Sequence, residues 1–260
     1  MKKKIPPFLT KVLVFLNLIN RIDVRFISNK NIIKNIYKSR LKKFLYQKKF
    51  FFAKKIILVN SLAFDNSMIS KEQVSQDYIV HIDAALNYNH KTAVRGKLSE
   101  DSIKKHYYYL NIFLDKVSKY FKKKVIVCIH PSYNIKEHKK YLNNFRVFKF
   151  KTREFIRKAY LVTFFDSTTI LDAVILNKRI IGLISKFTSD NDIRRQYAWS
   201  NNIKCVKQTL SEDFIFNKKE INKLSSNKDY DYKNYIETYL KRKNNNLGVQ
   251  EIIKYINKYL

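Results

Sequence analysis

Residues 124–133 read KVIVCIHPSY and residues 151–183 read KTREFIRKAYLVTFFDSTTILDAVILNKRIIGL, and these two stretches decide the fold class. Each contains a continuous apolar run, at residues 125–129 and 161–165, that is typical of a strand covered on both faces. Helical patterns separate such runs, and the connections between them are short. This alternation predicts an α/β fold with a mostly parallel, Rossmann-like sheet.

The alternation extends over most of the chain. Expected strands are residues 55–60, 78–82, 125–129, 146–150, 161–165, 179–183 and 203–206. Expected helices are residues 99–121, 136–142, 152–158, 168–176 and 249–260, with N-caps at Ser99, Thr152 and Ser167. We therefore expect a basic, helical N-terminal region (1–75), a Rossmann-like domain (76–210) and a helical C-terminal tail (211–260).

The charge of the chain is strongly basic. Its 53 Lys and Arg residues against 21 Asp and Glu residues give a net charge of +32, which favours anionic partners such as nucleic acid, anionic lipid or polyanionic substrates. A/T-rich codon usage is a competing explanation, because Asn, Ile, Phe and Tyr are abundant together with Lys. Residues 1–55 hold sixteen basic residues and one acidic residue, interleaved with apolar ones, as in a segment that binds a membrane surface.

Other sequence features limit the class of protein. The apolar run at residues 5–19 contains Lys11 and is shorter than the roughly 20 residues of a membrane span, and no small-residue cleavage site follows it. Cys128 and Cys205 lie in apolar strand-like contexts and form no metal motif, so we expect buried thiols. No RNP-like, zinc or recognition-helix motif supports nucleic-acid binding. We expect a cytoplasmic protein, peripheral at the inner face of the cell membrane.

Two polar corners follow the apolar runs of the deciding stretches. His130 precedes a proline, which favours extended backbone and would hold the imidazole at a strand tip. Ser167, Thr168 and Thr169 stand where a helix begins, so hydroxyls and free N–H groups would meet an anion there. Carboxyl ends of parallel strands bind ligands, and these groups suit a phosphate. The alternative is an ordinary loop histidine and an ordinary N-cap.

Further candidate residues lie near these corners. Asp83 ends the strand at 78–82 and is the candidate general base, with His90 as the second candidate. Asp172 is placed to reach a ribose hydroxyl, and Lys151 to add positive charge at the phosphate. A turn-forming aspartate and a carboxylate that complements the helix dipole are the alternatives for Asp83 and Asp172.

The order of these motifs resembles the donor-binding half of GT-B glycosyltransferases that build bacterial surface polysaccharides. His130-Pro131 is similar to the HP motif of sialyltransferase-like and capsule enzymes, and Ser167-Thr168-Thr169 to their Ser-Ser/Thr motif. The resemblance covers roughly residues 75–185. It implies that His130 and the hydroxyl corner hold the phosphate of a nucleotide sugar and that an upstream acid, best matched by Asp83, acts as base.

The resemblance also implies a function. It is transfer of a sugar, from a donor of CMP-sugar type, to a polysaccharide or lipid-linked glycan, without metal or other cofactor. Alternatives are a glycerophosphotransferase of teichoic-acid type, an inactive or partial GT-B remnant with a reduced acceptor domain, and a basic nucleic-acid-binding protein.

Overall fold

The computed structural model describes residues 22–28, 53–69, 76–83, 86, 98–224, 232–241 and 247–259. The chain divides into two compact units, each with a parallel sheet of its own. The larger unit is Lys71–Tyr232, and the smaller one combines Met1–Ser70 with Lys233–Leu260. Residues 211–232 thus group with the larger unit. The three regions expected from sequence, 1–75, 76–210 and 211–260, stay a prediction.

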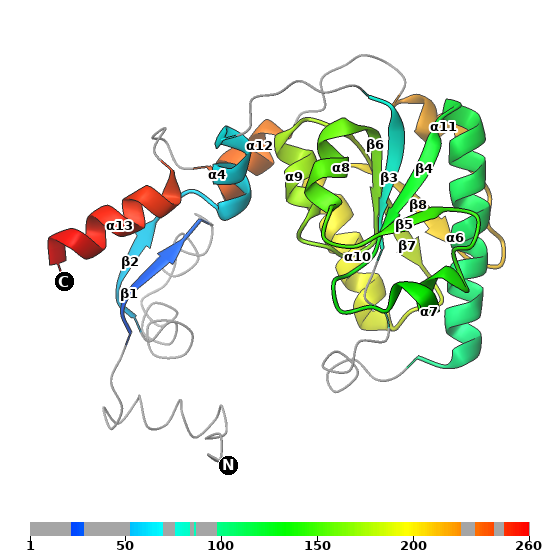
Figure 1. Ribbon diagram of the computed structural model, residues 1–260, viewed down its shortest axis with the longest axis horizontal. Coiled ribbons are helices and arrows are strands. Elements are labelled where there is room, and N and C mark those ends of the chain that lie inside the picture. Colours follow the sequence, from blue (N-terminus) through cyan, green and yellow to red (C-terminus); the bar gives the residue numbers. More distant parts are fainter. Residues whose placement is uncertain are drawn as a thin grey trace, which may run out of the picture. The chain divides into compact units, whose positions relative to one another are not determined.

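The larger unit alternates strands and helices (Figure 1). Its described elements are β3 (Tyr78–Ile82), α6 (Glu100–Phe121), β4 (Lys124–Cys128), α7 (Ile135–Lys139), β5 (Arg146–Phe148), α8 (Thr152–Lys158), β6 (Ala159–Phe164), α9 (Ile170–Ile175), β7 (Arg179–Ser185), α10 (Asp190–Ile203), β8 (Val206–Leu210) and α11 (Lys218–Asn222). The described strands form one six-stranded sheet in the order β5-β4-β3-β6-β7-β8, and every neighbouring pair is parallel. The predicted α/β class with a Rossmann-like parallel sheet is confirmed.

The central strand β3 sets the geometry of the carboxyl edge. Because β3 pairs with β4 on one side and with β6 on the other, the direction of winding reverses at β3, which makes this a topological switch point. In the register, Ile82 lies opposite both Cys128 and Phe164. The three strands therefore end level with one another.

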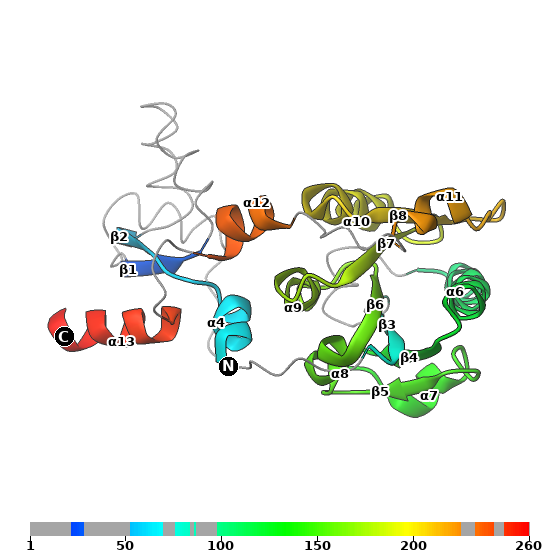
Figure 2. The ribbon, with the colours of Figure 1, turned by 90° about the horizontal axis from the view of Figure 1, so that it is seen from above.

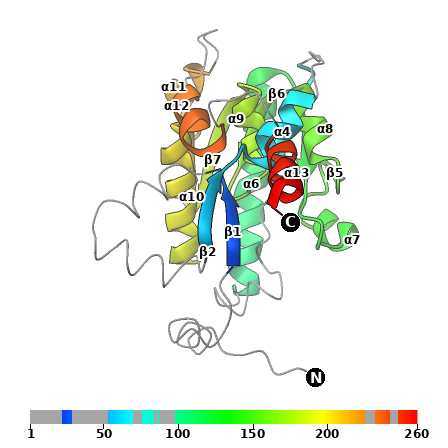
Figure 3. The ribbon, with the colours of Figure 1, turned by 90° about the vertical axis from the view of Figure 1, so that its left-hand side faces the viewer.

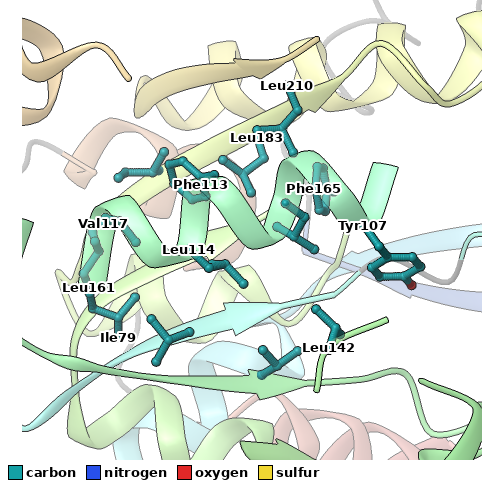
Figure 4. Close-up of a cluster of buried hydrophobic side chains, with 14 of the residues drawn as sticks. Ile79, Tyr107, Phe113, Leu114, Val117, Leu142, Leu161, Phe165, Leu183 and Leu210 are labelled. Carbon is teal, nitrogen blue, oxygen red and sulfur yellow. The ribbon is translucent and has the colours of Figure 1, made fainter. Parts of the chain in front are cut away.

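Helices cover both faces of this sheet (Figure 2). Helix α6 lies against one face, and α8 and α9 lie against the other. Figure 4 shows Phe113, Leu114 and Val117 of α6 among sheet side chains such as Leu161 and Leu183. All five are 0% exposed. Each such side chain contributes roughly 1.5–3 kcal/mol when it is fully buried, so this layer is the main core of the unit.

The predicted N-cap of α6 is confirmed. The side chain of Ser99 accepts a hydrogen bond from the Ser102 N–H at 3.1 Å, and Glu100 and Asp101 place negative charge in the first turn. Lys122 ends the helix in the left-handed conformation, with φ 52°. A cap at each end fixes where α6 begins and ends against the sheet.

One sequence prediction needs correction in the last part of the sheet unit. The strand expected at 203–206 begins only at Val206, because Ile203 is the last residue of α10. Lys204 takes a left-handed conformation with φ 60°, and its N–H bonds the carbonyl oxygens of Ser200 and Asn201. This C-cap closes the helix and delays the strand.

The smaller unit is described in part (Figure 3). Its described elements are β1 (Ile22–Ile27), β2 (Ala53–Leu58), α4 (Leu62–Ile69), α12 (Lys233–Tyr235), the π-helical turn η2 (Ile236–Leu240) and α13 (Gly248–Tyr259). Strands β1 and β2 pair in parallel. The helical N-terminal region predicted from sequence is therefore wrong at residues 22–27, where the irregular apolar pattern belongs to a strand. No helix among the described residues is long and apolar enough to cross a membrane.

Gly182 allows α10 to approach β7, and this contact gives a test of the packing. A Cβ at Gly182 would lie 2.1 Å from Oγ of Ser200 and 3.2 Å from Sγ of Cys205. We expect Gly182→Ala to lower the free energy of unfolding by about 1–3 kcal/mol, measured by urea denaturation.

Ser200→Ala supplies the control, because its buried Oγ has no hydrogen-bond partner among the described residues. Ser200→Ala alone should be nearly neutral, and the double variant should recover part of the loss. Equal stability of Gly182→Ala and the unmodified chain would contradict the packing described here.

Candidate functional site

The polar residues predicted from sequence lie at the carboxyl edge of the central strands. Asp83 follows β3, His130 follows β4 by two residues, and Ser167 follows β6 by three. The backbone N–H of Asp83 donates to the carbonyl oxygen of Cys128 at 2.9 Å, which continues the ladder past the end of β3. These corners therefore flank the switch point, where open α/β sheets bind ligands.

Asp83 is buried, and two partners hold its carboxylate. The Tyr107 hydroxyl donates to Oδ2 at 3.0 Å, and Nε2 of His138 lies 2.7 Å from the same oxygen. The Tyr107 hydroxyl also lies 2.7 Å from Nε2 of His138. One arrangement of hydrogens satisfies all three contacts: Tyr107 donates to Asp83, and the Nε2–H is shared between the carboxylate and the phenol oxygen.

The surroundings of Asp83 favour its charged form. Burial on its own would raise the pKa of Asp83, but hydrogen bonds and charge interactions with His138 and His81 outweigh burial and hold this pKa well below its ordinary value. Burial raises the pKa of Tyr107 well above its ordinary value, and the Asp83 charge adds to the effect. Asp83 is therefore an anion and Tyr107 a neutral donor near pH 7.

Two more buried histidines stand behind this group. Nδ1 of His81 lies 2.8 Å from Oγ1 of Thr163, and its Nε2 lies 3.7 Å from Oδ1 of Asp83. Nδ1 of His106 lies 2.8 Å from Oγ of Ser185. Burial lowers the pKa of His106 to about 4, so its imidazole is neutral near pH 7. The histidines thus extend a polar layer beneath the carboxyl edge.

His130 is partly exposed, and its ring has a defined orientation. The Ser132 N–H donates to Nδ1 at 3.2 Å, so Nδ1 is the acceptor and the imidazole proton is on Nε2. A donating Nε2–H at a strand tip is the group that a phosphate oxygen would accept from. Phosphate binding at His130 stays a prediction.

The hydroxyl corner differs from the expectation in one respect. The predicted helix 168–176 is shorter, since α9 covers Ile170–Ile175 and its N-cap residue Thr169 makes no side-chain hydrogen bond. Ser167 accepts from the Thr169 N–H at 3.3 Å, in a turn that precedes the helix. Ser167 therefore does not cap the helix. Thr168 is exposed and Thr169 half-buried, so these hydroxyls line the turn.

The remaining predicted residues occupy separate positions. Oδ2 of Asp172 accepts from Nε of Arg153 at 3.0 Å, which ties α9 to α8; burial raises the pKa of Asp172, and Arg153 opposes this. Lys151 is exposed at the start of α8, where it replaces the expected cap Thr152 as the N-cap residue and makes no side-chain cap. His90 lies outside the described residues.

Sequence reasoning missed His138 and Tyr107, which contact Asp83. Tyr107 lies in an apolar stripe of α6 with Leu110, Leu114 and Val117, and the stripe indicated only that the position was buried. His138 lies on α7, eight residues after His130. The available signal was a phenol on a fully apolar stripe, since a buried hydroxyl needs a polar partner.

Other binding features of the described residues lie elsewhere. A cavity of about 670 Å³ is lined by Tyr78, Lys124 and Arg146, the first residues of their strands. It opens at the amino ends of the strands, away from the carboxyl-edge corners. Among the described residues, no His, Cys, Asp and Glu side chains gather in a group that could hold a metal ion.

Comparison with known proteins gives weak likenesses only. No protein-family model and no curated protein matches the chain. One similar solved structure is UDP-GlcNAc 2-epimerase of Methanocaldococcus jannaschii in complex with UDP-GlcNAc and UDP (15% identity, 80% of this chain, 56% of that chain, TM-score 0.44). A second is Os79 of O. sativa with UDP and deoxynivalenol-3-glucoside (11%, 85% and 52%, 0.37).

A third similar structure is a glycosyl transferase family 9 protein of Veillonella parvula (11% identity, 99% of this chain, 80% of that chain, TM-score 0.33). The chain thus spans about half the length of the first two structures.

The buried His106 makes stability depend on pH. Its pKa is about 4 in the folded protein and 6.5 as the ordinary value, so the unfolded chain binds the extra proton between these limits. The free energy of unfolding should fall as pH is lowered from 6.5 to 4, by an amount on the order of 3 kcal/mol from this residue. Urea denaturation at a series of pH values measures the slope.

His106→Asn should flatten this slope, and Tyr108→Phe, at an exposed position on the same helix, should leave it unchanged. An unaltered slope in His106→Asn would show that other groups carry the pH dependence.

Proposed function

We propose that the carboxyl edge of β3, β4 and β6 binds a nucleotide sugar and that the protein transfers the sugar to a hydroxyl acceptor. The observation that carries the proposal is the level placement of the His130 and Ser167 corners on either side of Asp83 and its partner His138. Hydrogen-bond donors for a phosphate thus lie at the ends of the strands on either side of β3, and the buried Asp83–His138 pair lies at the switch point. Glycosyl transfer requires both a group that binds the leaving phosphate and a group that accepts a proton.

The donor phosphate is proposed to lie between the two corners. His130 donates from Nε2, and Ser167, Thr168 and Thr169 supply hydroxyl and backbone N–H groups. Lys151 adds positive charge. These groups stabilise the charge that grows on the phosphate as the bond to the sugar breaks.

The proton of the acceptor hydroxyl is proposed to go to His138. The Asp83 side chain is 0% exposed, so an acceptor does not reach it directly, and its depressed pKa makes it a weak base. Because Asp83 accepts the Nε2–H of His138, the neutral form of this imidazole has its lone pair on Nδ1, and the His138 side chain is 8% exposed. Asp83 is then a positioning residue, and His90 stays the second candidate base.

The finer parts of the function are also proposals. The resemblance of the HP and Ser-Thr-Thr motifs to surface-polysaccharide enzymes supports a CMP-sugar donor and a polysaccharide or lipid-linked glycan as acceptor. Asp172 would contact the ribose through Oδ1, because Arg153 holds Oδ2. In the alternative of glycerophosphate transfer of teichoic-acid type, the same residues would bind the donor phosphate. The nucleotides to be tested therefore include CDP-glycerol.

Nucleotide binding tests the proposed phosphate-binding residues His130, Ser167, Thr168 and Thr169, here called the phosphate corner. CMP, CDP, UDP or CDP-glycerol at low millimolar concentration should raise the melting temperature, and His130→Ala should weaken binding by about 10–100-fold, as expected for loss of one charge-assisted hydrogen bond. His130→Gln, which keeps an N–H donor, should lose less. Lys207→Ala removes a distant exposed charge and serves as the control.

A chain that no nucleotide stabilises would refute the proposed function. Salt-sensitive binding of random RNA or DNA without a nucleotide effect would favour the nucleic-acid alternative.

The rate at which nucleotide is released from the nucleotide-sugar donor tests the proposed roles of His138 and Asp83 in accepting the proton. His138→Ala and Asp83→Asn should each lower the rate by about 10²-fold or more, while the nucleotide Kd stays within a few-fold of the unmodified protein. Tyr107→Phe removes one donor to Asp83 but leaves the His138 contact, so its rate should fall less.

Undiminished turnover in His138→Ala would assign the base elsewhere, with His90 the next variant to measure. Tight nucleotide binding with no turnover of any donor would identify an inactive remnant.

A further inference from the structure

Three aliphatic side chains of α13 form an exposed stripe among the described residues of the smaller unit. Val249, Ile253 and Ile256 are 47%, 51% and 40% exposed. Their spacing of four and three residues places them on one side of the helix. The neighbouring side is used for packing, because the ring of Tyr255 meets Phe26 of β1 edge-on at 5.8 Å. The exposed stripe is therefore additional to the apolar surface that holds α13 in place.

The start of α13 is fixed firmly to α4. Both carboxylate oxygens of Asp65 accept from the first helical N–H groups, Oδ1 from Gly248 at 2.9 Å and Oδ2 from Val249 at 3.1 Å. A Cβ at Gly248 would lie 2.4 Å from the carbonyl oxygen of Asn60, so only glycine permits this approach. A helix anchored in this way presents its stripe at a defined angle.

The charge of the unit indicates what covers the stripe. The unit formed by Met1–Ser70 and Lys233–Leu260 has 22 Lys and Arg residues and four Asp and Glu residues. Lys254 and Lys258 are exposed on the polar side of α13 itself, about 100° and about 140° around the helix from Ile253. Long lysine stems at such positions place their ammonium groups at lipid headgroups while aliphatic side chains enter the layer below.

We propose that α13 docks on an anionic membrane surface, with Val249, Ile253 and Ile256 entering the boundary between headgroups and acyl chains. A lipid surface supplies both apolar contact and a continuous negative field, which a basic unit with an exposed aliphatic stripe requires. A protein partner would need an apolar groove within a strongly acidic surface. The proposal uses none of the carboxyl-edge residues, so it stands apart from the proposed function.

The test is sedimentation of the full chain with phosphatidylcholine vesicles that contain about 30% phosphatidylglycerol, against pure phosphatidylcholine vesicles. We expect binding to the anionic vesicles that weakens as salt rises. Ile253→Asn with Ile256→Asn should reduce the partition coefficient about tenfold or more. The matched control, Gln250→Ala with Asn257→Ala, changes exposed polar positions of the same helix and should bind like the unmodified chain.

A second measurement does not depend on the double variant. A polarity-sensitive fluorophore at Ile253→Cys should shift to the blue on addition of anionic vesicles, and the same fluorophore at Gln250→Cys should shift much less. Equal shifts at both positions, or unchanged binding of the asparagine variant, would overturn the proposal. So would self-association of the unmodified chain that the asparagine substitutions abolish, because the stripe would then bind a second copy.

Discussion

The carboxylate of Asp83 accepts hydrogen bonds at a point where its side chain has no exposed surface. An unpaired charge in such a place would cost several kcal/mol, so its partners are a condition of the fold. Tyr107 comes from α6 and His138 from α7, while Asp83 itself ends β3. Apolar contacts hold α6 against the sheet, but they have no preferred geometry. The hydrogen bonds to Asp83 do have one, so they fix where α6 and α7 lie along the strands.

The same bonds determine what chemistry Asp83 can perform. Contacts that hold the carboxylate charged also depress its basicity, so the residue that anchors the edge is poorly suited to remove a proton itself. The imidazole of His138 shares the network and has a second nitrogen. In the proposed function, His138 therefore accepts the proton while Asp83 stays charged. Stability and chemistry are combined in adjacent groups of one network.

The sequence predicts the sheet better than the site. Apolar runs and helical spacing are local, and they placed β3 and the cap of α6 at Ser99 correctly. Tyr107 and His138 are 24 and 55 residues away from Asp83, and no local periodicity records such contacts. The positions of Asp83, His130 and Ser167 at strand ends were predictable from the alternation. The burial of Asp83 and the short α9 depend on tertiary packing, as does the strand at Ile22–Ile27.

The two units differ in how many segments of the chain form them. The sheet unit is continuous in sequence from Lys71 to Tyr232, so its core depends on its own residues alone. The smaller unit is assembled from both sides of it: Ser61 N–H donates to the Leu240 carbonyl at 2.8 Å, and Asp65 caps α13 across 183 residues. Closing so long a loop costs chain entropy, which the contacts within the smaller unit must offset. The contacts that hold α13 lie within the smaller unit, and the proposed phosphate-binding residues lie within the sheet unit, so each proposal depends on the residues of one unit.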